Sequence, residues 1–437
     1  MVSEVAEPDY PLEKAVFVRA LATGHGRALI HVERYGAEGV QDEILDAALF
    51  PKFYDIQCNG YGEEWLARLC TMAGLVDTII SRSHGIAGDD DVLRCRLLKE
   101  LTLQGHEGAR SALREMCRND EESGDLLGCA EIVEAEGEEG FVFVAERLGE
   151  RVLADHDYWA ESWQLTVPVS VLDEKFGKGW SMAILDRESP ANPRLAAYRE
   201  AVLRSQARDW ERQAQPKVSV EPIELIQTSP KREPWLRSTG KNATAEEQLE
   251  IAALDFTRME PVSLENYLNY FQHTGFPELR EEHLALLGTV DEKCRWRLHE
   301  VLARHAHPQV REAAYEALAR GGAGAFVQLL RSSGLEEDTD PLLEAISIPA
   351  ILEDVDECHQ IGSHLLNLVE TNRVMTDVRL PLWIYQHGHC LICRYSAVNA
   401  MAERSTLSQW VAEECLSEAY ETTREVAAKY LGAERSF

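Results

Sequence analysis

Apolar residues recur at helical spacing along much of the chain, most clearly between Asp291 and Gly321. Two runs there place apolar side chains on one helical face: Leu298, Val301 and Leu302, then Val310, Ala313, Ala314, Ala317 and Leu318. This spacing predicts two amphipathic helices. Pro308 suits the first turn of the second helix, and Gly321 suits the position that follows it. A single hairpin cannot bury its apolar face, so we expect similar hairpins stacked on either side, as in an α-solenoid.

Weaker helical patterns precede and follow this hairpin, with one interruption. We expect an N-terminal helical repeat region (1–154), an irregular basic middle region and linker (155–244), and C-terminal repeats (245–437). Two stretches are ambiguous. Residues 141–148 fit a helix or a short strand, and the alternation in 164–172 resembles an edge strand because Pro168 lies within it. The predicted fold class is all-α, an α-α superhelix with a less regular middle region.

The central hairpin resembles a HEAT repeat, because residues 307–318 (HPQVREAAYEAL) join a junction proline, an early Val-Arg pair and small residues. Residues 393–398 and 423–428 look like weaker copies. The chain is similar to a group of bacterial HEAT-repeat proteins without assigned activity, on the segments YDIQCNGYGEEWL, KCRWRLHEVLARHAHPQVRE and WIYQHGHCLICRYSAV. This resemblance implies a solenoid scaffold, with no catalytic residue or cofactor to carry over.

The balance of charge is strongly acidic, with 75 acidic and 44 basic side chains and a formal net charge of −31. Such a field disfavours nucleic acid and anionic membranes and speeds encounter with basic partners, although it also serves solubility. The first residues lack a signal-peptide pattern and no apolar run reaches 18 residues, so we expect a cytoplasmic protein. The ten cysteines are scattered, and we expect them to be reduced and buried on helix faces.

The acid is concentrated between Glu115 and Glu139, where ten carboxylates accompany only Arg118. This run is either a solvated face or a docking surface for a basic protein. The candidate partner-binding residues are Glu131, Glu134, Glu136, Glu138 and Glu139. Residues 194–241 reverse the sign, with ten basic and six acidic side chains, and are the candidate contact for nucleic acid.

Three other groups of polar residues are candidates for chemistry. An N-terminal polar set could line a pocket or form a buried hydrogen-bonded network: His25, Arg27, His31, Tyr54, Asp55 and Gln57. His387, His389, Cys390 and Cys393 offer four metal-ligand types, but four ligands within seven residues strain a tetrahedral zinc site, so no metal is favoured. His305 and His307 flank a helix junction and are expected to cap the preceding helix as cations.

These features favour a non-catalytic interaction scaffold whose acidic surface binds a basic protein partner. Two alternatives stay open. One is a neutralising, immunity-type partner of a basic toxin or nuclease. The other is a lyase-like enzyme on a HEAT scaffold that uses the N-terminal polar site. No cofactor is expected, and the oligomeric state is not predicted.

Overall fold

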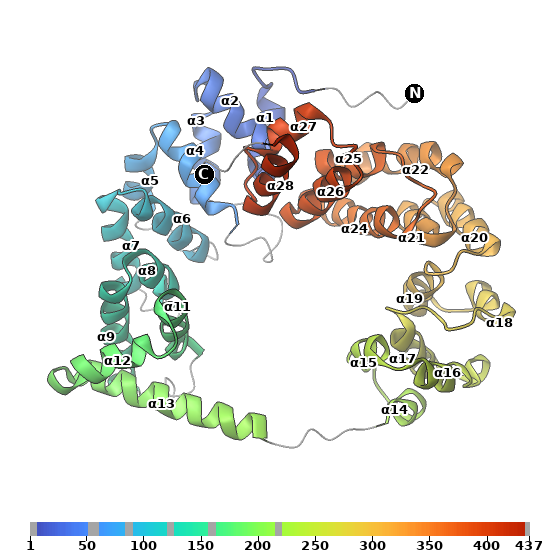
Figure 1. Ribbon diagram of the computed structural model, residues 1–437, viewed down its shortest axis with the longest axis horizontal. Helices are drawn as coiled ribbons and strands as arrows, with labels where there is room; N and C mark the ends of the chain where they lie inside the picture. The colour runs from blue at the N-terminus through green and yellow to red at the C-terminus, as the bar shows by residue number, and fades with distance from the viewer. Residues whose placement is uncertain are drawn as a thin grey trace. The chain divides into compact units, whose positions relative to one another are not determined.

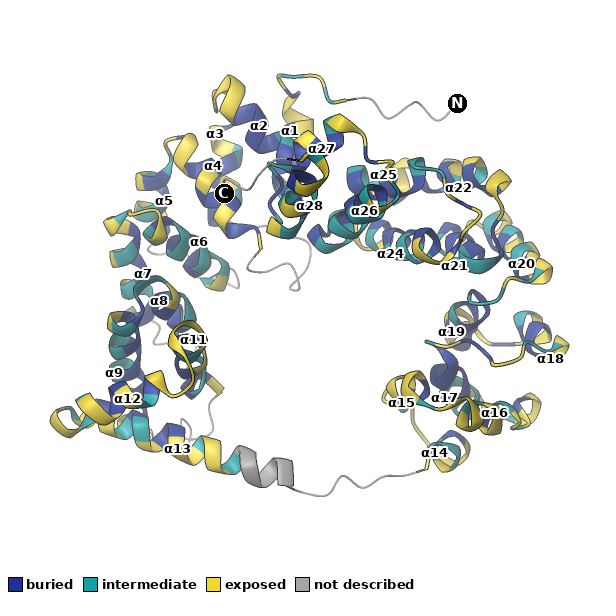
Figure 2. Cartoon of the chain, viewed as in Figure 1, coloured by how far each residue is buried: buried dark blue, intermediate teal, exposed yellow. Residues whose placement is uncertain are grey.

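The computed structural model of the protein (Figure 1) describes residues 7–50, 61–83, 91–119, 126–155, 163–214 and 221–432. Within these residues the secondary structure is entirely helical, and Figure 2 shows that most helices have a buried side and an exposed side. The chain divides into two compact units. The N-terminal unit is Pro8–Lys217 with Ser417–Glu421, and the C-terminal unit is Val218–Leu416 with Thr422–Phe437 and Met1–Glu7.

The N-terminal unit is built from helices that mostly pack against helices one or two places away in the chain. They are α1 (Lys14–Thr23), α2 (Gly26–Tyr35), α3 (Gln41–Leu49), α4 (Glu63–Met72), α5 (Val76–Ser83), α6 (Asp91–Leu103), α7 (Glu107–Asn119), α8 (Cys129–Glu136), α9 (Glu138–Ala154), α11 (Val167–Phe176), α12 (Trp180–Glu188) and α13 (Pro193–Ala214), with the 3-10 turns η2 (Trp163–Leu165) and η3 (Ser189–Ala191). The late segment Ser417–Glu421 belongs to this unit because Ala419 N donates to Gly24 O over 3.0 Å and Trp65 Nε1 donates to Ser417 O over 2.8 Å.

In the C-terminal unit α17 packs on α15 and α19, and α21 packs on α20 and also on α24, which lies three helices further along the chain. Its α-helices are α14 (Pro222–Thr228), α15 (Leu236–Asn242), α16 (Ala245–Ala252), α17 (Pro261–Phe271), α18 (Glu281–Ala285), α19 (Glu292–Leu302), α20 (Pro308–Ala319), α21 (Ala323–Ser333), α22 (Thr339–Ile346), α23 (Pro349–Glu353), α24 (Val355–Thr371), α25 (Arg379–His387), α26 (Leu391–Glu403), α27 (Gln409–Cys415) and α28 (Glu421–Leu431). The 3-10 turns are η4 (Phe256–Arg258), η5 (Leu286–Gly288) and η6 (Glu336–Asp338).

The two helices predicted from the central pattern form as α19 and α20, but they do not pack against each other as a hairpin: α20 packs on α21, and α19 packs on α17 and α21. Asp291 begins α19 by accepting a hydrogen bond from Cys294 N over 2.9 Å. Pro308 occupies the first turn of α20, and Gly321 follows that helix with a φ of +82°. The predicted apolar face is buried, since Leu298, Val301, Leu302, Val310 and Ala314 have no more than 1% of their surface exposed. These side chains join the main hydrophobic core of the C-terminal unit.

The junction histidines do not act as predicted. His307 caps the start of α20, because its Nδ1 accepts a hydrogen bond from Gln309 N over 3.3 Å. The Nε2 atom of His305 accepts from Phe276 N over 3.1 Å, and burial lowers the pKa of His305. A ring nitrogen that accepts a hydrogen bond is unprotonated, so His305 is a neutral acceptor, and His307 caps the following helix in place of the preceding one.

The middle region is largely helical wherever it is described, in contrast to the expected irregularity. The strand-like alternation of 164–172 folds as η2 and the start of α11, because Pro168 takes the first turn of a helix, where it loses no hydrogen bond. Residues 141–148 lie inside α9. The middle region is shared between the two units, whose division falls at Lys217 and Val218.

The cysteines that the structure describes form no disulfide with one another, and all but Cys393 are buried. They pack within the helical core, as the sequence predicts. No helix in the described part of the chain combines the length and the apolar composition needed to cross a bilayer.

Candidate functional site

A small basic pocket lies within the C-terminal unit, where five helices or helix ends meet. Its volume is about 170 Å³. Arg237 comes from α15, and the ends of α17 and α19 supply further lining residues, as do α21 and α24. The lining residues are Arg237, Gln272, His273, Glu300, Ala303, Arg304, Gln328, Arg331, His364 and Asn367.

Helix ends position the first half of this pocket. Gln272 follows the last residue of α17, and its carbonyl accepts a hydrogen bond from Arg304 Nε over 2.9 Å. Arg304 itself lies just beyond α19. A cation at a helix C-terminus interacts favourably with the free carbonyls there, so α17 holds the Arg304 side chain in place. The Arg304 Nη groups form no hydrogen bond within the described residues and remain available to a ligand.

Close helix packing positions Arg237. A Cβ atom built on Gly240 of α15 would lie 1.9 Å from Tyr270 O, so only glycine lets α15 approach α17 this closely. Opposite this wall, Arg331 projects from α21, and its Nε and Nη2 each lie 3.2 Å from Thr371 Oγ1 of α24. A neutral hydroxyl orients this guanidinium without cancelling its charge.

None of the three pocket arginines forms an ion pair with a described carboxylate. Other arginines of the same unit do: Arg297 Nε lies 3.1 Å from Glu265 Oε1, and Arg311 Nε donates to Asp338 Oδ2 over 2.8 Å. Burial, and secondly the proximity of Arg331, lower the pKa of Arg304 to about 10. Burial also lowers the pKa of Arg331. The pocket therefore concentrates three arginines around a single carboxyl group, Glu300, which offsets only part of their positive charge.

The titratable neighbours respond to this charge. Burial and then Arg331 lower the pKa of His364 to about 4, so His364 is neutral near pH 7. The pKa of His273 is also lowered, by burial and then by Arg237 and Arg304. Burial raises the pKa of Glu300, which accepts a hydrogen bond from Gln272 Nε2. Protonation of His364 would add a positive charge, and protonation of Glu300 would remove a negative one. Both changes favour a bound anion.

Two wider depressions in the same unit are lined by more carboxylates than arginines. One, of about 1020 Å³, places Arg320 within 3.8 Å of Glu316. The other, of about 930 Å³, is lined by Arg311, which pairs with Asp338. Both exceed the basic pocket in size, but their linings are acidic on balance. The basic pocket is the stronger candidate because binding depends on charge that the fold leaves unpaired.

The predicted acidic docking residues lie on α8 and the first turn of α9, and cations from other helices reach most of them. Glu134 Oε2 lies 2.8 Å from Lys99 Nζ, and Glu136 pairs with both Arg110 and Arg114. Glu139 also pairs with both arginines, at 2.9 and 2.8 Å. The exposure of the set varies widely, from 3% for the Glu136 side chain to 66% for Glu139.

The other two acidic residues differ in burial. Glu131 is mostly buried, with Oε1 3.5 Å from Arg96 Nε, and burial raises its pKa. Glu138 is partly exposed, accepts from Trp180 Nε1 over 2.8 Å and lies 3.7 Å from Arg187 Nη2.

Two described members of the N-terminal polar set, His25 and His31, have different partners. His25 precedes α2, and its Nδ1 lies 3.0 Å from Glu418 Oε1 of the late segment. His31 Nδ1 accepts from Leu12 N over 3.0 Å, and its ring lies between Phe17 and Tyr35. Arg27 is partly buried on α2. Tyr54, Asp55 and Gln57 lie outside the described residues.

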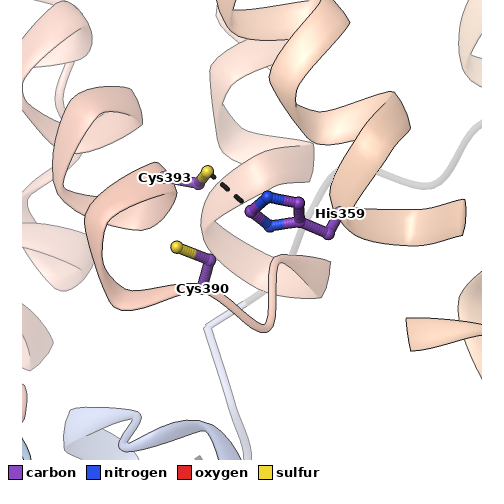
Figure 3. Close-up of side chains that lie close together, drawn as sticks. All are labelled: His359, Cys390 and Cys393. Atoms are coloured by element: carbon purple, nitrogen blue, oxygen red, sulfur yellow. Dashed lines mark hydrogen bonds between the residues drawn. The ribbon is translucent and has the colours of Figure 1, made fainter. Parts of the chain in front are cut away.

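Of the four weak metal candidates, two come together. Cys390 and Cys393 lie at the start of α26, where His359 of α24 joins them (Figure 3). His387 ends α25, its ring centroid is 5.3 Å from that of Trp383, and its carbonyl accepts from Cys358 Sγ. His389 is partly buried in the short connection that follows.

Sequence reasoning missed the basic pocket and His359, because these residues are distant in the chain. One sequence feature could have pointed to the pocket. Arg304 lies just beyond the end of a predicted helix and next to His305. No protein-family model, curated protein or solved structure matches the chain.

Proposed function

We propose that the protein is a non-catalytic helical-repeat binding protein, built as a HEAT-like α-solenoid, whose basic pocket binds an anionic group of its ligand. The preference of helices for neighbours one or two places away in the chain supports the repeat architecture. Arrays of this kind expose the ends and inner faces of successive helices, and the ends of α17 and α19 line the pocket.

The observation that carries this proposal is the set of three arginines that have no ion-pair partner among the described residues, in a chain of net charge −31. Carboxylates are abundant in this protein, and other arginines of the same unit, such as Arg297 and Arg311, pair with one. Guanidinium groups bind phosphate and carboxylate through paired N–H donors. Arg237, Arg304 and Arg331 therefore match a ligand that carries one of these groups.

The pocket size limits what can enter. Sites for whole coenzymes or drug-sized ligands span roughly 300–1,000 Å³, whereas this pocket measures about 170 Å³. It accommodates a single anionic group, with the rest of the ligand outside. The lining residues include no serine, threonine or cysteine that could act as a nucleophile, which favours binding over group transfer.

Calorimetric titration of the intact protein with sulfate at low ionic strength tests the proposal. A charge-assisted hydrogen bond contributes about 1.5–3 kcal/mol, so Arg331→Gln should weaken sulfate binding at least about tenfold. Arg320→Gln is the matched control, because it removes an exposed arginine of the same unit that already pairs with Glu316. Equal affinities in the wild type and both variants, or equal losses in both, would refute the pocket as the anion site.

A basic protein partner on the acidic surface is the second candidate. The exposed carboxylates of Glu134, Glu138 and Glu139 favour it, since their side chains are 44%, 42% and 66% exposed although each has a cation nearby. The negative field of the chain would speed the encounter with such a partner. Association rates of Glu138 and Glu139 variants with a basic peptide test this candidate.

A further inference from the structure

The start of α26 brings together three side chains that share a preference for soft metal ions. Cys390 is the residue that caps α26, and Cys393 lies in its first turn. His359 reaches them from the neighbouring helix α24, and Figure 3 shows its ring directed toward the two sulfurs. The three ligand atoms lie within 4.8 Å of one another.

We propose that His359, Cys390 and Cys393 form a zinc site of the Cys₂His type that joins α24 to α26. The two thiolates and the imidazole occupy three corners of a tetrahedron, and a water molecule takes the fourth. Zinc favours these ligand types, and three protein ligands with one open position is an established coordination pattern for this ion.

The distances suit this ion. Zinc bonds of about 2.3 Å to sulfur and about 2.0 Å to nitrogen place the ligand atoms of a tetrahedral site roughly 3.5–3.8 Å apart. Cys393 Sγ lies 3.9 Å from His359 Nδ1, and the remaining separations do not exceed 4.8 Å. Small side-chain rotations would close the set around an ion without moving the helices.

The backbone fixes both cysteines at the helix start. A Cβ atom built on Gly388 would lie 2.5 Å from Ile384 O, so glycine allows the sharp passage from α25 to α26. Arg394 Nη1 donates to the carbonyl of Gly388 over 3.1 Å and holds the same turn. The positive end of the helix dipole favours the thiolate form that metal binding requires.

Burial also suits a metal site. Cys390 is 3% exposed, whereas Cys393 and His359 are partly exposed, so an ion can enter from one side. Cys358 precedes His359 in α24, but its Sγ donates to His387 O over 3.4 Å and does not belong to the three-ligand cluster. A helix start with two cysteines also resembles a dithiol redox pair, and His359 is the feature that favours metal.

Cobalt titration of the reduced full-length protein tests the site, because Co²⁺ bound by thiolates gives charge-transfer absorption. We expect one Co²⁺ per chain, displaced by an equal amount of Zn²⁺. Cys390→Ser and Cys393→Ser should abolish the charge-transfer band, and His359→Gln should weaken Co²⁺ binding at least about tenfold. Cys358→Ser is the matched control, since it removes an adjacent thiol and keeps a hydrogen-bond donor.

Circular dichroism of each variant separates loss of ligand from loss of fold. The metal site is refuted if the reduced wild-type protein shows no thiolate-to-cobalt band. It is also refuted if His359→Gln binds as tightly as the wild type, because the pair would then act as a dithiol alone. Rapid formation of a Cys390–Cys393 disulfide, identified by mass spectrometry, together with no cobalt binding, would assign a redox pair instead.

Discussion

The acidic surface on α8 and α9 and the basic pocket of the C-terminal unit differ in whether their charged side chains have oppositely charged partners. On the acidic surface, carboxylates that are dense in the sequence meet cations from α6 and α7, such as Lys99 and Arg114. In the pocket, Arg304 and Arg331 have no described carboxylate partner although acidic side chains dominate the chain. The affinity for a charged ligand depends on the side chains that have no oppositely charged partner in the fold. The number of charged residues in a sequence segment does not show which side chains these are.

The two regions also differ in what they contribute to stability. Breaking an ion pair with a buried member is costly, because it leaves a charge without its partner. An unpaired, half-buried arginine already bears this desolvation cost in the native state. Buried charges without a partner are common at binding sites, since a ligand of opposite charge can offset their desolvation free energy. Removing charge should therefore destabilise the acidic surface and leave the pocket stable.

The largest expected effect is on Glu136, whose side chain is 3% exposed and pairs with Arg110 and Arg114. Glu136→Gln leaves both guanidinium groups without this partner. We expect the free energy of unfolding to fall by about 2 kcal/mol, less than for a fully buried pair because both arginines are partly exposed. Urea denaturation of the intact protein measures this loss.

Two controls accompany that experiment. Glu139→Gln removes an exposed carboxylate that contacts the same arginines, and its urea midpoint should match that of the wild type. Arg331→Gln should likewise keep the midpoint, because it breaks no ion pair. A loss of stability in Arg331→Gln comparable to that in Glu136→Gln would remove the distinction between the two regions.

A smaller effect is expected from pH. The pKa of His364 is about 4 in the folded protein, against an ordinary value of 6.5, because of burial and Arg331. A bound anion favours the imidazolium and raises this pKa, so binding takes up a proton as the pH falls from 6.5 toward 4. Sulfate affinity should therefore increase on acidification, by up to about tenfold at pH 5.

His364→Gln should flatten this pH dependence, because the titrating group is gone. His307→Gln, which changes a histidine outside the pocket, should retain it. Calorimetric titration with sulfate between pH 7 and pH 5 distinguishes these cases. A sulfate affinity that stays constant over this range in the wild-type protein would exclude His364 from the anion site.

Local patterns in the sequence predicted the helices well, but they did not bring together the residues that line the basic pocket. The apolar spacing around Leu298 and Ala314 gave α19 and α20 because helix periodicity is a property of neighbouring residues. The alternation around Pro168 led to the wrong prediction of an edge strand, since a proline suits both an edge strand and a helix start.

Tertiary packing explains what sequence reasoning missed. Arg114 reaches Glu136 from 22 positions away, and the candidate metal ligand His359 lies 34 positions before Cys393. Arg237 and Arg331 are further apart still, and only the packing of α15, α17, α19 and α21 brings them to one pocket. A count of charges within a segment contains no such information.

The smallest expected effect concerns the exposed part of the acidic surface. If Glu138 and Glu139 steer a basic partner, changing both to Gln should slow association with a lysine-rich peptide about two- to threefold, and added salt should remove the difference. Arg187→Gln should act in the opposite direction, because it frees Glu138 from the cation 3.7 Å away and increases the uncompensated negative charge. Stopped-flow association rates measure both changes. Opposite signs would show that the acidic surface, like the pocket, acts through the charge that its neighbours leave unpaired, whereas unchanged rates in both variants would mark these carboxylates as a solvated face.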